Sequence, residues 1–433
     1  MPDSRHPARV WRRELRPADG DRGIDPPQDR PGALWWRCAR LRPRWRAGDY
    51  RGAARAGRFR RRHLDGLDLA GLHADLERLY EIGEFEQVAF TLAEVEGRRG
   101  LIIRAREKSW GPRYLRFGLN YASDMQGRSS FNFLGSLTWG SLNARGAEWR
   151  TDLQLGRAAG VTTELYQPFD FSGFTFVAPR AEYTSVFTDV YNSAGHRTGE
   201  YRVRSARAGL DLGLQLSKYG ELRAGLVRGR SRAVVDVGMV ELPATSFRVA
   251  GARTRLVFDR LDSASFPRHG GYTEIELFLS RTSLGAEASY ERLVAGWDRY
   301  WTRRRNVFFV NSNGGSSLNS TLPFFEEFPL GGLFSLSGYH EGELRGQHYA
   351  VLRAGYYRQV SALPGAVGSG VFLGGWAEAG NVWARRGDIG LDGLKTSLTI
   401  ALGADTALGP LYLAVGSAGS RHTRTYLSLG RTF

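Results

Sequence analysis

The stretch Gly409-Pro410-Leu411-Tyr412-Leu413-Ala414-Val415-Gly416 has the composition of a β-strand, and Thr423 to Phe433 has that of another. A short turn of Ser, Gly and His residues separates the two. A strand in this position has an edge that needs a partner, and closure into a barrel is a common way to supply one. We therefore expect a β-barrel, with Gly430 and the aromatic Phe433 as the signal of its terminal strand.

Working backwards from this hairpin, apolar and polar residues alternate in long segments. Between Arg202 and Ser217 the even positions from 206 to 216 are Ala or Leu, and the odd positions are Ser, Arg, Gly, Asp or Gln. The stretches 271–280 and 397–404 repeat this pattern. Alternation with period 2 over about ten residues is typical of a strand that faces lipid on one side and a lumen on the other.

Sixteen such segments are found after Trp110, an even number, as single-chain bacterial barrels require. Aromatic residues near their ends, among them Trp139, Trp149, Tyr183, Trp376 and Trp383, suit membrane interfaces. The predicted fold class is all-β, a sixteen-stranded antiparallel transmembrane barrel over 110–433. The segments are 113–122, 129–139, 146–156, 159–168, 174–186, 201–217, 220–231, 246–258, 271–282, 286–298, 304–314, 347–360, 370–382, 395–404, 410–418 and 424–433.

Composition restricts the alternatives. The 433 residues contain no run of 18 apolar residues, which excludes a helical membrane span, and the single Cys38 excludes a disulfide within the chain. The net charge of +16 is concentrated in residues 1–62, which hold 18 Arg against seven Asp and Glu. The body of the chain is therefore not basic, and we expect no nucleic-acid partner.

Residues 1–62 form an Arg-rich leader that we leave unassigned and expect to be disordered. Its Trp residues, such as Trp11 and Trp45, also fit an aromatic and basic nucleic-acid arm, and a wrong start or a frame shift is a third interpretation. No apolar core of a signal peptide is visible in it.

Residues 63–109 are predicted to begin with a helix over 67–81, where Leu recurs at spacings of three and four. Strands over 85–93 and 101–106 follow, with Arg98-Arg99-Gly100 in the turn region. Helix, strand and strand make half of a small α/β module.

Taken together, these residues resemble the superfamily of outer-membrane barrels preceded by POTRA modules, the bacterial surface antigen family. Residues 79–88 resemble part of a POTRA module, so we expect a partial POTRA-like module over 63–109. The other matching stretches are a mid-barrel signature with Asp259, Asp262, Pro267, Gly270 and Gly271, a lumenal-loop motif with Gly331, Gly332, Ser337, Gly338 and Tyr339, and the last two strands.

The variant Leu336-Ser337-Gly338-Tyr339 is most similar to the translocator barrel of patatin-like phospholipases. The family motif usually carries Arg where this chain has Ser337, and that Arg meets an acidic group for which Glu378, followed by Gly380, is the matching position. We expect Glu378 to pair with Arg345 or Arg353, or to lie solvated in the lumen. No Gly-x-Ser-x-Gly pentapeptide is present, so this polypeptide should not be an esterase or another enzyme.

Each candidate site also has an interpretation that involves no specific function. Asp259 and Asp262 suit turn capping and salt bridges to Arg260 or Arg268 better than acid–base catalysis. His340, Glu341, Glu343 and His348 lack the spacing of a helical metal site, and no cofactor is expected. The loop glycines suit tight packing better than phosphate binding, because no helix follows them. Gly338 and Tyr339 are the best functional candidates, as a loop anchor on the barrel wall.

The connection over 315–346 is long, apolar and Gly-rich, so we expect it to fold into the lumen as a plug. Arg207, Arg223 and Arg353, with Asp152, Asp211, Glu221, Glu274 and Glu276, would line the pore. The resemblance implies a bacterial outer-membrane anchor and translocator, with membrane lipid, a translocated or periplasmic polypeptide and the barrel-assembly machinery as partners. The alternatives are the detached barrel of a patatin-like phospholipase whose catalytic domain is missing upstream, and a passive porin.

Overall fold

The computed structural model describes residues 33–36, 85–95 and 98–107, and then residues 113–430 except 126–128, 144, 171–172, 192–196, 239–244, 366 and 420–421. The chain divides into two compact units, a small unit that includes residues 62–107 and a large unit that includes residues 108–433. Among the helices of the described residues, none has the length and apolar character of a membrane span.

The small unit contains a three-stranded sheet in the order β1-β3-β2, formed by β1 (Ala33–Trp36), β2 (Phe85–Val95) and β3 (Arg98–Glu107). The two predicted strands are confirmed, but the prediction of a turn at 98–100 is wrong. Arg98 already pairs with Val95, which places the turn before β3. The predicted helix over 67–81, Cys38 and most of the leader lie outside the described residues, so the partial POTRA-like module stays a prediction.

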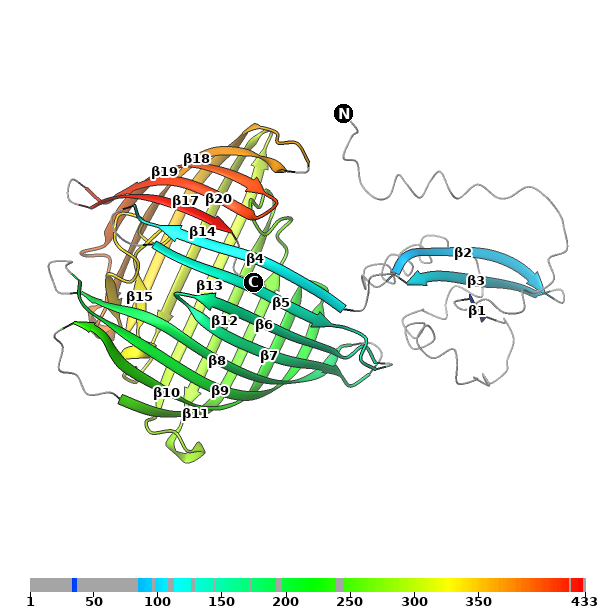
Figure 1. Cartoon of the computed structure of the whole chain (residues 1–433), viewed down its shortest axis with the longest axis horizontal. Coiled ribbons are helices and arrows are strands. Elements are labelled where there is room, and N and C mark those ends of the chain that lie inside the picture. Colours follow the sequence, from blue (N-terminus) through cyan, green and yellow to red (C-terminus); the bar gives the residue numbers. More distant parts are fainter. Residues whose placement is uncertain are drawn as a thin grey trace. The chain divides into compact units, whose positions relative to one another are not determined.

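The large unit is a closed barrel of sixteen antiparallel strands, in which the strands follow one another in chain order and the last pairs with the first (Figure 1). All sixteen predicted strands are confirmed, and β8, β9 and β10 are longer than expected. The strands are β4 (Arg113–Ser123), β5 (Ser129–Trp139), β6 (Glu148–Gly156), β7 (Ala159–Pro168), β8 (Thr175–Tyr191), β9 (Arg197–Ser217), β10 (Gly220–Gly238), β11 (Thr245–Asp259), β12 (Gly270–Ser280), β13 (Tyr290–Arg303), β14 (Asn306–Ser316), β17 (His348–Ser361), β18 (Gly368–Trp383), β19 (Lys395–Thr406), β20 (Gly409–Ser417) and β21 (Thr423–Gly430).

The two faces of the wall follow the predicted alternation. Leu210 and Leu398 are 52% and 63% exposed on the outside, whereas Asp211 and Thr399, one residue further along, are 2% and 1% exposed on the inside. Because successive side chains of a strand point to opposite faces, a single register serves both lipid and lumen.

The aromatic residues divide between these faces. Trp139, Trp149 and Tyr183 are exposed on the outside, as an interfacial position requires. Trp376 and Trp383 are buried instead, so their predicted place in an interfacial belt is wrong. Trp376 and Glu378 are two residues apart in one strand and therefore share its inner face.

The two ends of the barrel differ in their connections. One end, which we call the turn end, has tight turns such as 218–219, 304–305 and 407–408. The opposite loop end gives rise to the long loop, residues 317–347, between β14 and β17. This loop contains a short helix, η3 (Phe324–Glu326), and a small hairpin of β15 (Phe328–Leu330) and β16 (Leu344–Gly346).

In the described part of the chain, the long loop supplies side chains to four hydrophobic clusters of the barrel interior. Leu322 and Phe328 pack with Val249 and Tyr290, Leu330 and Leu336 pack with Val351, Phe325 packs beside Tyr201, and Phe334 packs beside Trp376. The prediction that residues 315–346 are packed rather than solvated is confirmed.

Candidate functional site in the lumen and at the seam

The first half of the long loop is bound to the wall formed by β9, β11 and β13. The ring centroids of Phe324 and Tyr201 lie 5.0 Å apart, and those of Phe325 and Phe247 lie 5.4 Å apart. Glu326 accepts a hydrogen bond of 2.5 Å from Arg207 Nη2. The lumenal position predicted for Arg207 is therefore right, but its partner comes from the loop and not from another strand.

The tip of the loop is held by Arg353 on β17. Its Nη1 donates to the Phe334 carbonyl oxygen at 3.0 Å, and its Nε and Nη2 donate to Asn311 Oδ1 at 3.0 and 2.9 Å. The guanidinium also lies 4.9 Å from the centroid of the Phe334 ring. Arg353 is thus a lumenal residue that fixes the loop.

Ser337, at the position where the resemblance implies an Arg, lies against Glu378 on β18. The Ser337 backbone N–H donates to Glu378 Oε2 at 2.7 Å, and Ser397 Oγ donates to the same oxygen at 2.5 Å. Neither predicted Arg partner forms an ion pair with Glu378 in the described part of the chain. Arg345 donates instead to the carbonyl oxygens of Phe324 and Glu327.

Glu378 is also not solvated, because only 2% of its surface is exposed. Its Oε1 has no hydrogen-bond partner among the described residues. A main-chain N–H and a hydroxyl thus replace the guanidinium expected in the family as partners of this carboxylate. Hydrogen bonding satisfies one of its two oxygens, which reduces the cost of burying the charge.

Gly338 and Tyr339 pack against the end of β20 and the start of β21. A Cβ on Gly338 would lie 2.5 Å from both the Cβ and the backbone nitrogen of Ala418, so only glycine allows this approach. The Tyr339 ring stacks on His422 with centroids 4.8 Å apart. Burial raises the pKa of the Tyr339 phenol, and the charge of Glu343 raises it further.

Gly331 and Gly332 form the bend before this anchor. Both have positive φ, and the Gly332 N–H donates to the Tyr339 carbonyl oxygen at 3.1 Å. The motif glycines therefore shape the loop that presents Ser337 and Tyr339 to the wall. Gly380, two residues beyond Glu378 on β18, lies where a Cβ would come within 2.5 Å of the Ala350 carbonyl oxygen on β17.

The mid-barrel signature forms the turn between β11 and β12. Asp259 Oδ1 accepts from the Leu261 N–H at 3.0 Å, and Asp262 Oδ1 accepts from the Arg268 and His269 N–H groups at 2.8 and 3.1 Å. Gly270 has a φ of 104°, and the Gly271 carbonyl oxygen accepts from the Arg260 N–H. These carboxylates cap a turn, and in the described residues neither forms an ion pair with Arg260 or Arg268.

This turn inserts Phe266 into the lumen at the turn end. The Phe266 and Phe372 rings stack with centroids 4.3 Å apart, and the Pro267 carbonyl oxygen accepts a hydrogen bond from the Tyr357 hydroxyl. The surrounding rings enclose a cavity of about 160 Å³. We call this group the aromatic cluster: Phe266, Tyr300, Phe309, Phe334, Tyr357, Phe372, Trp376 and Tyr412.

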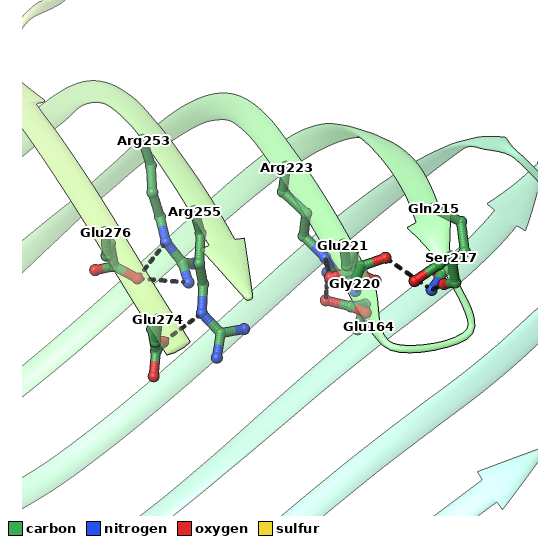
Figure 2. A network of polar contacts seen from close by, with 10 residues as sticks. All are labelled: Glu164, Gln215, Ser217, Gly220, Glu221, Arg223, Arg253, Arg255, Glu274 and Glu276. Atoms are coloured by element: carbon green, nitrogen blue, oxygen red, sulfur yellow. Dashed lines mark hydrogen bonds and ion pairs between the residues drawn. The ribbon is translucent and has the colours of Figure 1, made fainter. Parts of the chain in front are cut away.

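Another part of the lumen is a charged wall formed by β7 and β10 to β12. Arg253 and Arg255 point toward Glu276 and Glu274 across neighbouring strands, with shortest distances of 2.9 and 2.7 Å (Figure 2). Arg223 bridges Glu164 at 2.7 Å and Glu221 at 2.5 Å. These contacts confirm the lumenal positions predicted for Arg223, Glu221, Glu274 and Glu276, and Asp152 pairs with Arg150 on β6.

The barrel closes at a seam between β21 and β4. Described residues of this pair are in register at four positions, from Leu427 opposite Ser123 to Gly430 opposite Asn120, whereas the other neighbouring strand pairs are in register at seven or more. Gly430 has a φ of 102°, and a Cβ there would collide with the Leu119 carbonyl oxygen. Phe433 lies outside the described residues.

The long loop, its anchor and β21 lie within the residues that one family of known proteins matches. The model of the Omp85 superfamily domain matches residues 142–433, about two thirds of the sequence. The chain belongs to the Omp85 superfamily. This is a superfamily of outer-membrane translocation and assembly barrels, as the resemblance of the mid-barrel and loop motifs predicted.

Solved structures confirm the Omp85 fold. The chain is similar to BamA from Haemophilus ducreyi lacking POTRA domains 1–3, with a TM-score of 0.65, 13% identity and coverage of 84% of this chain and 79% of that chain. CdiB from Escherichia coli (TM-score 0.57, 14% identity, 83% and 70% coverage) and CdiB from Acinetobacter baumannii (0.55, 12%, 83% and 68%) are also similar. Comparison with curated proteins gives no match.

Sequence reasoning missed the aromatic cluster and the contacts of β21 in this Omp85 barrel. Phe266 was part of a recognised signature, and Tyr357, Phe372 and Tyr412 stand at inward positions of predicted strands. Aromatic residues at inward positions are therefore the signal that was available. Among the described residues, no group of three or more His, Cys, Asp or Glu side chains is arranged to hold a metal ion.

Proposed function

We propose that this chain is a bacterial outer-membrane protein that inserts or translocates a polypeptide, with the seam as the place where the substrate engages and the long loop as a lumenal plug. The short register of the seam carries this proposal, and membership of the Omp85 superfamily supports it.

The seam offers a substrate strand the backbone groups it needs. Residues Arg113 to Leu119 of β4 precede the register shared with the described part of β21, so their edge extends toward the turn end. An extended polypeptide that pairs with this edge gains main-chain hydrogen bonds without a specific sequence. Among the described residues, opening these four residue pairs disrupts fewer hydrogen bonds than opening any other pair of neighbouring strands.

The plug is supported by the contacts on both sides of the lumen. Phe324, Phe325 and Glu326 bind the walls of β9, β11 and β13, and Ser337 binds β18. A loop bound at both places crosses the lumen and fills it with packed side chains. Passage through the lumen then requires the loop to move.

Site-specific photocrosslinking in the native host tests engagement at the seam. A photoreactive residue at Leu119 on β4 is expected to form polypeptide adducts. A disulfide between Ala122→Cys and Ser428→Cys, which lie directly opposite in the seam, is expected to suppress these adducts after oxidation, with Cys38→Ser to remove the native thiol.

The matched control carries the photoreactive residue at Val161, which is exposed on the outer face of β7. It is expected to give few polypeptide adducts, unchanged by the seam disulfide. Equal adducts at Leu119 and Val161, insensitive to the disulfide, would contradict engagement at the seam.

A further inference from the structure

The long loop contacts both strands of the seam. On the β21 side, the Tyr426 hydroxyl lies 2.9 Å from the Ser337 carbonyl oxygen and 3.0 Å from the Tyr339 carbonyl oxygen. On the β4 side, His340 Nδ1 lies 3.0 Å from Asp124 Oδ2. Four consecutive loop residues thus span the junction between the two strands.

These contacts lie at the loop end of the seam. Leu427 and Ser123 are the last residues in register there, and the next residues along the chain beyond them are Tyr426 of β21 and Asp124, which directly follows β4. Tyr426 is 7% exposed and Asp124 is 8% exposed, so both contacts are shielded from solvent. Shielded hydrogen bonds that involve a charged group are stronger than exposed ones.

The loop segment that makes these contacts is held together by hydrogen bonds of its own. The Tyr339 N–H donates to the Leu336 carbonyl oxygen at 3.0 Å, and the His340 N–H donates to Glu343 Oε2 at 2.7 Å. The same segment is bound to β18 through Ser337 and Glu378. Moving His340 away from β4 therefore displaces the segment that fills the lumen.

We propose that His340 and Tyr426 are positioning residues that clasp the seam, so that the loop leaves the lumen and β21 separates from β4 as one coupled event. This inference rests on the proposed function, because it states that the plug and the seam of that function move together. A polypeptide that displaces the loop then opens the edge with which it pairs, and a closed seam keeps the plug in place.

Disulfide formation between Ala122→Cys and Ser428→Cys, in the Cys38→Ser background and in lipid vesicles, measures how often the seam is closed. We expect Asp124→Ala and His340→Ala each to slow disulfide formation by about tenfold, because each removes a hydrogen bond to a charged group. The double variant should be no slower than either single variant, since both remove the same contact.

Two further variants separate the clasp from a general loss of structure. Tyr426→Phe keeps the ring and removes only the hydroxyl, and it is also expected to slow disulfide formation. Glu274→Gln breaks the ion pair with Arg255, away from the loop and the seam, and is expected to leave the rate unchanged.

Unchanged rates of disulfide formation in the Asp124, His340 and Tyr426 variants would overturn the clasp. Polypeptide adducts at Leu119 would persist in that case, so the proposed function would stand. Loss of adducts from the unmodified barrel would contradict the proposed function while leaving the clasp measurement intact. Additive effects of Asp124→Ala and His340→Ala would also overturn the clasp.

Discussion

The charged wall and the aromatic cluster line the same lumen, yet they are built from different kinds of contact. The charged wall pairs Arg253 and Arg255 with carboxylates on the neighbouring strand, and it pairs Arg223 with Glu164 on β7 and Glu221 on its own strand. The aromatic cluster packs rings from five strands around Phe266 of the β11–β12 turn and Phe334 of the long loop. Charged side chains tolerate water, whereas packed rings exclude it.

This difference indicates where a path opens when the loop moves. When Phe334 moves away with the loop, the charged wall stays intact, because the ion pairs of the wall are formed between strand residues. The aromatic cluster would lose a ring and its contact with Arg353. We infer that water and ions enter along the charged wall, while the aromatic cluster provides stability at the turn end.

The largest expected effect is on stability. Phe266→Ala removes a side chain that is 7% exposed and contacts Tyr357, Phe372 and Tyr412. We expect the free energy of unfolding to fall by about 3–5 kcal/mol, the usual effect of truncating a buried Phe. Urea unfolding in lipid vesicles measures it, with Leu398→Ala on the lipid face as the control. A loss no greater than that of the control would show that the cluster is not a core.

The next effect is on ion selectivity. Glu276→Lys, in a barrel lacking residues 323–346, replaces a partner of Arg253 with a second cation on the charged wall. We expect the permeability ratio to shift toward anions by about twofold, because salt screens a wall charge within about 10 Å. The reversal potential in a salt gradient measures this shift. An equal shift of the permeability ratio when Phe266 is replaced would show that the ions do not pass along the charged wall.

The smallest effect is the stability change on Glu274→Gln. Arg255 and Glu274 are about a third exposed, so their ion pair is partly screened. We expect a loss of at most about 1 kcal/mol in the free energy of unfolding. A loss as large as that of Phe266→Ala, measured in the same urea titration, would remove the contrast between the two regions.

The two regions also differ in how far sequence predicted them. The inward positions of Arg223, Glu221, Glu274 and Glu276 follow from period 2, because alternation fixes the face of every residue in a strand. Their partners do not follow, since a partner depends on the register between strands. The path of the long loop depends on tertiary contacts, so Glu326 was not predicted as the partner of Arg207.

At the seam and the loop anchor, too, the sequence predicted the residues but not their contact partners. The sequence motifs identified Gly430, Ser337 and Glu378 as site residues. A resemblance to a family, however, suggests the contact partner of such a residue only by analogy. With Ser337 in place of Arg, the partners of Glu378 are the Ser337 main-chain N–H and the Ser397 hydroxyl, and no side-chain pattern indicates the first of these. The helix over 67–81, the POTRA-like module, Phe433 and the upstream phospholipase domain stay predictions.

The central claim is that residues 317–347 close the lumen, and conductance after loop deletion tests it most directly. Deleting 323–346 leaves Leu322 beside Gln347, whose amide already exchanges hydrogen bonds of 2.7 and 3.1 Å with the Leu322 backbone, so the shortened connection can close. The control deletes 387–392, from the exposed loop between β18 and β19. In planar bilayers we predict a large stable conductance for the first deletion and an unchanged low conductance for the control. Equal conductance of the two deletions and the full-length barrel would contradict the claim.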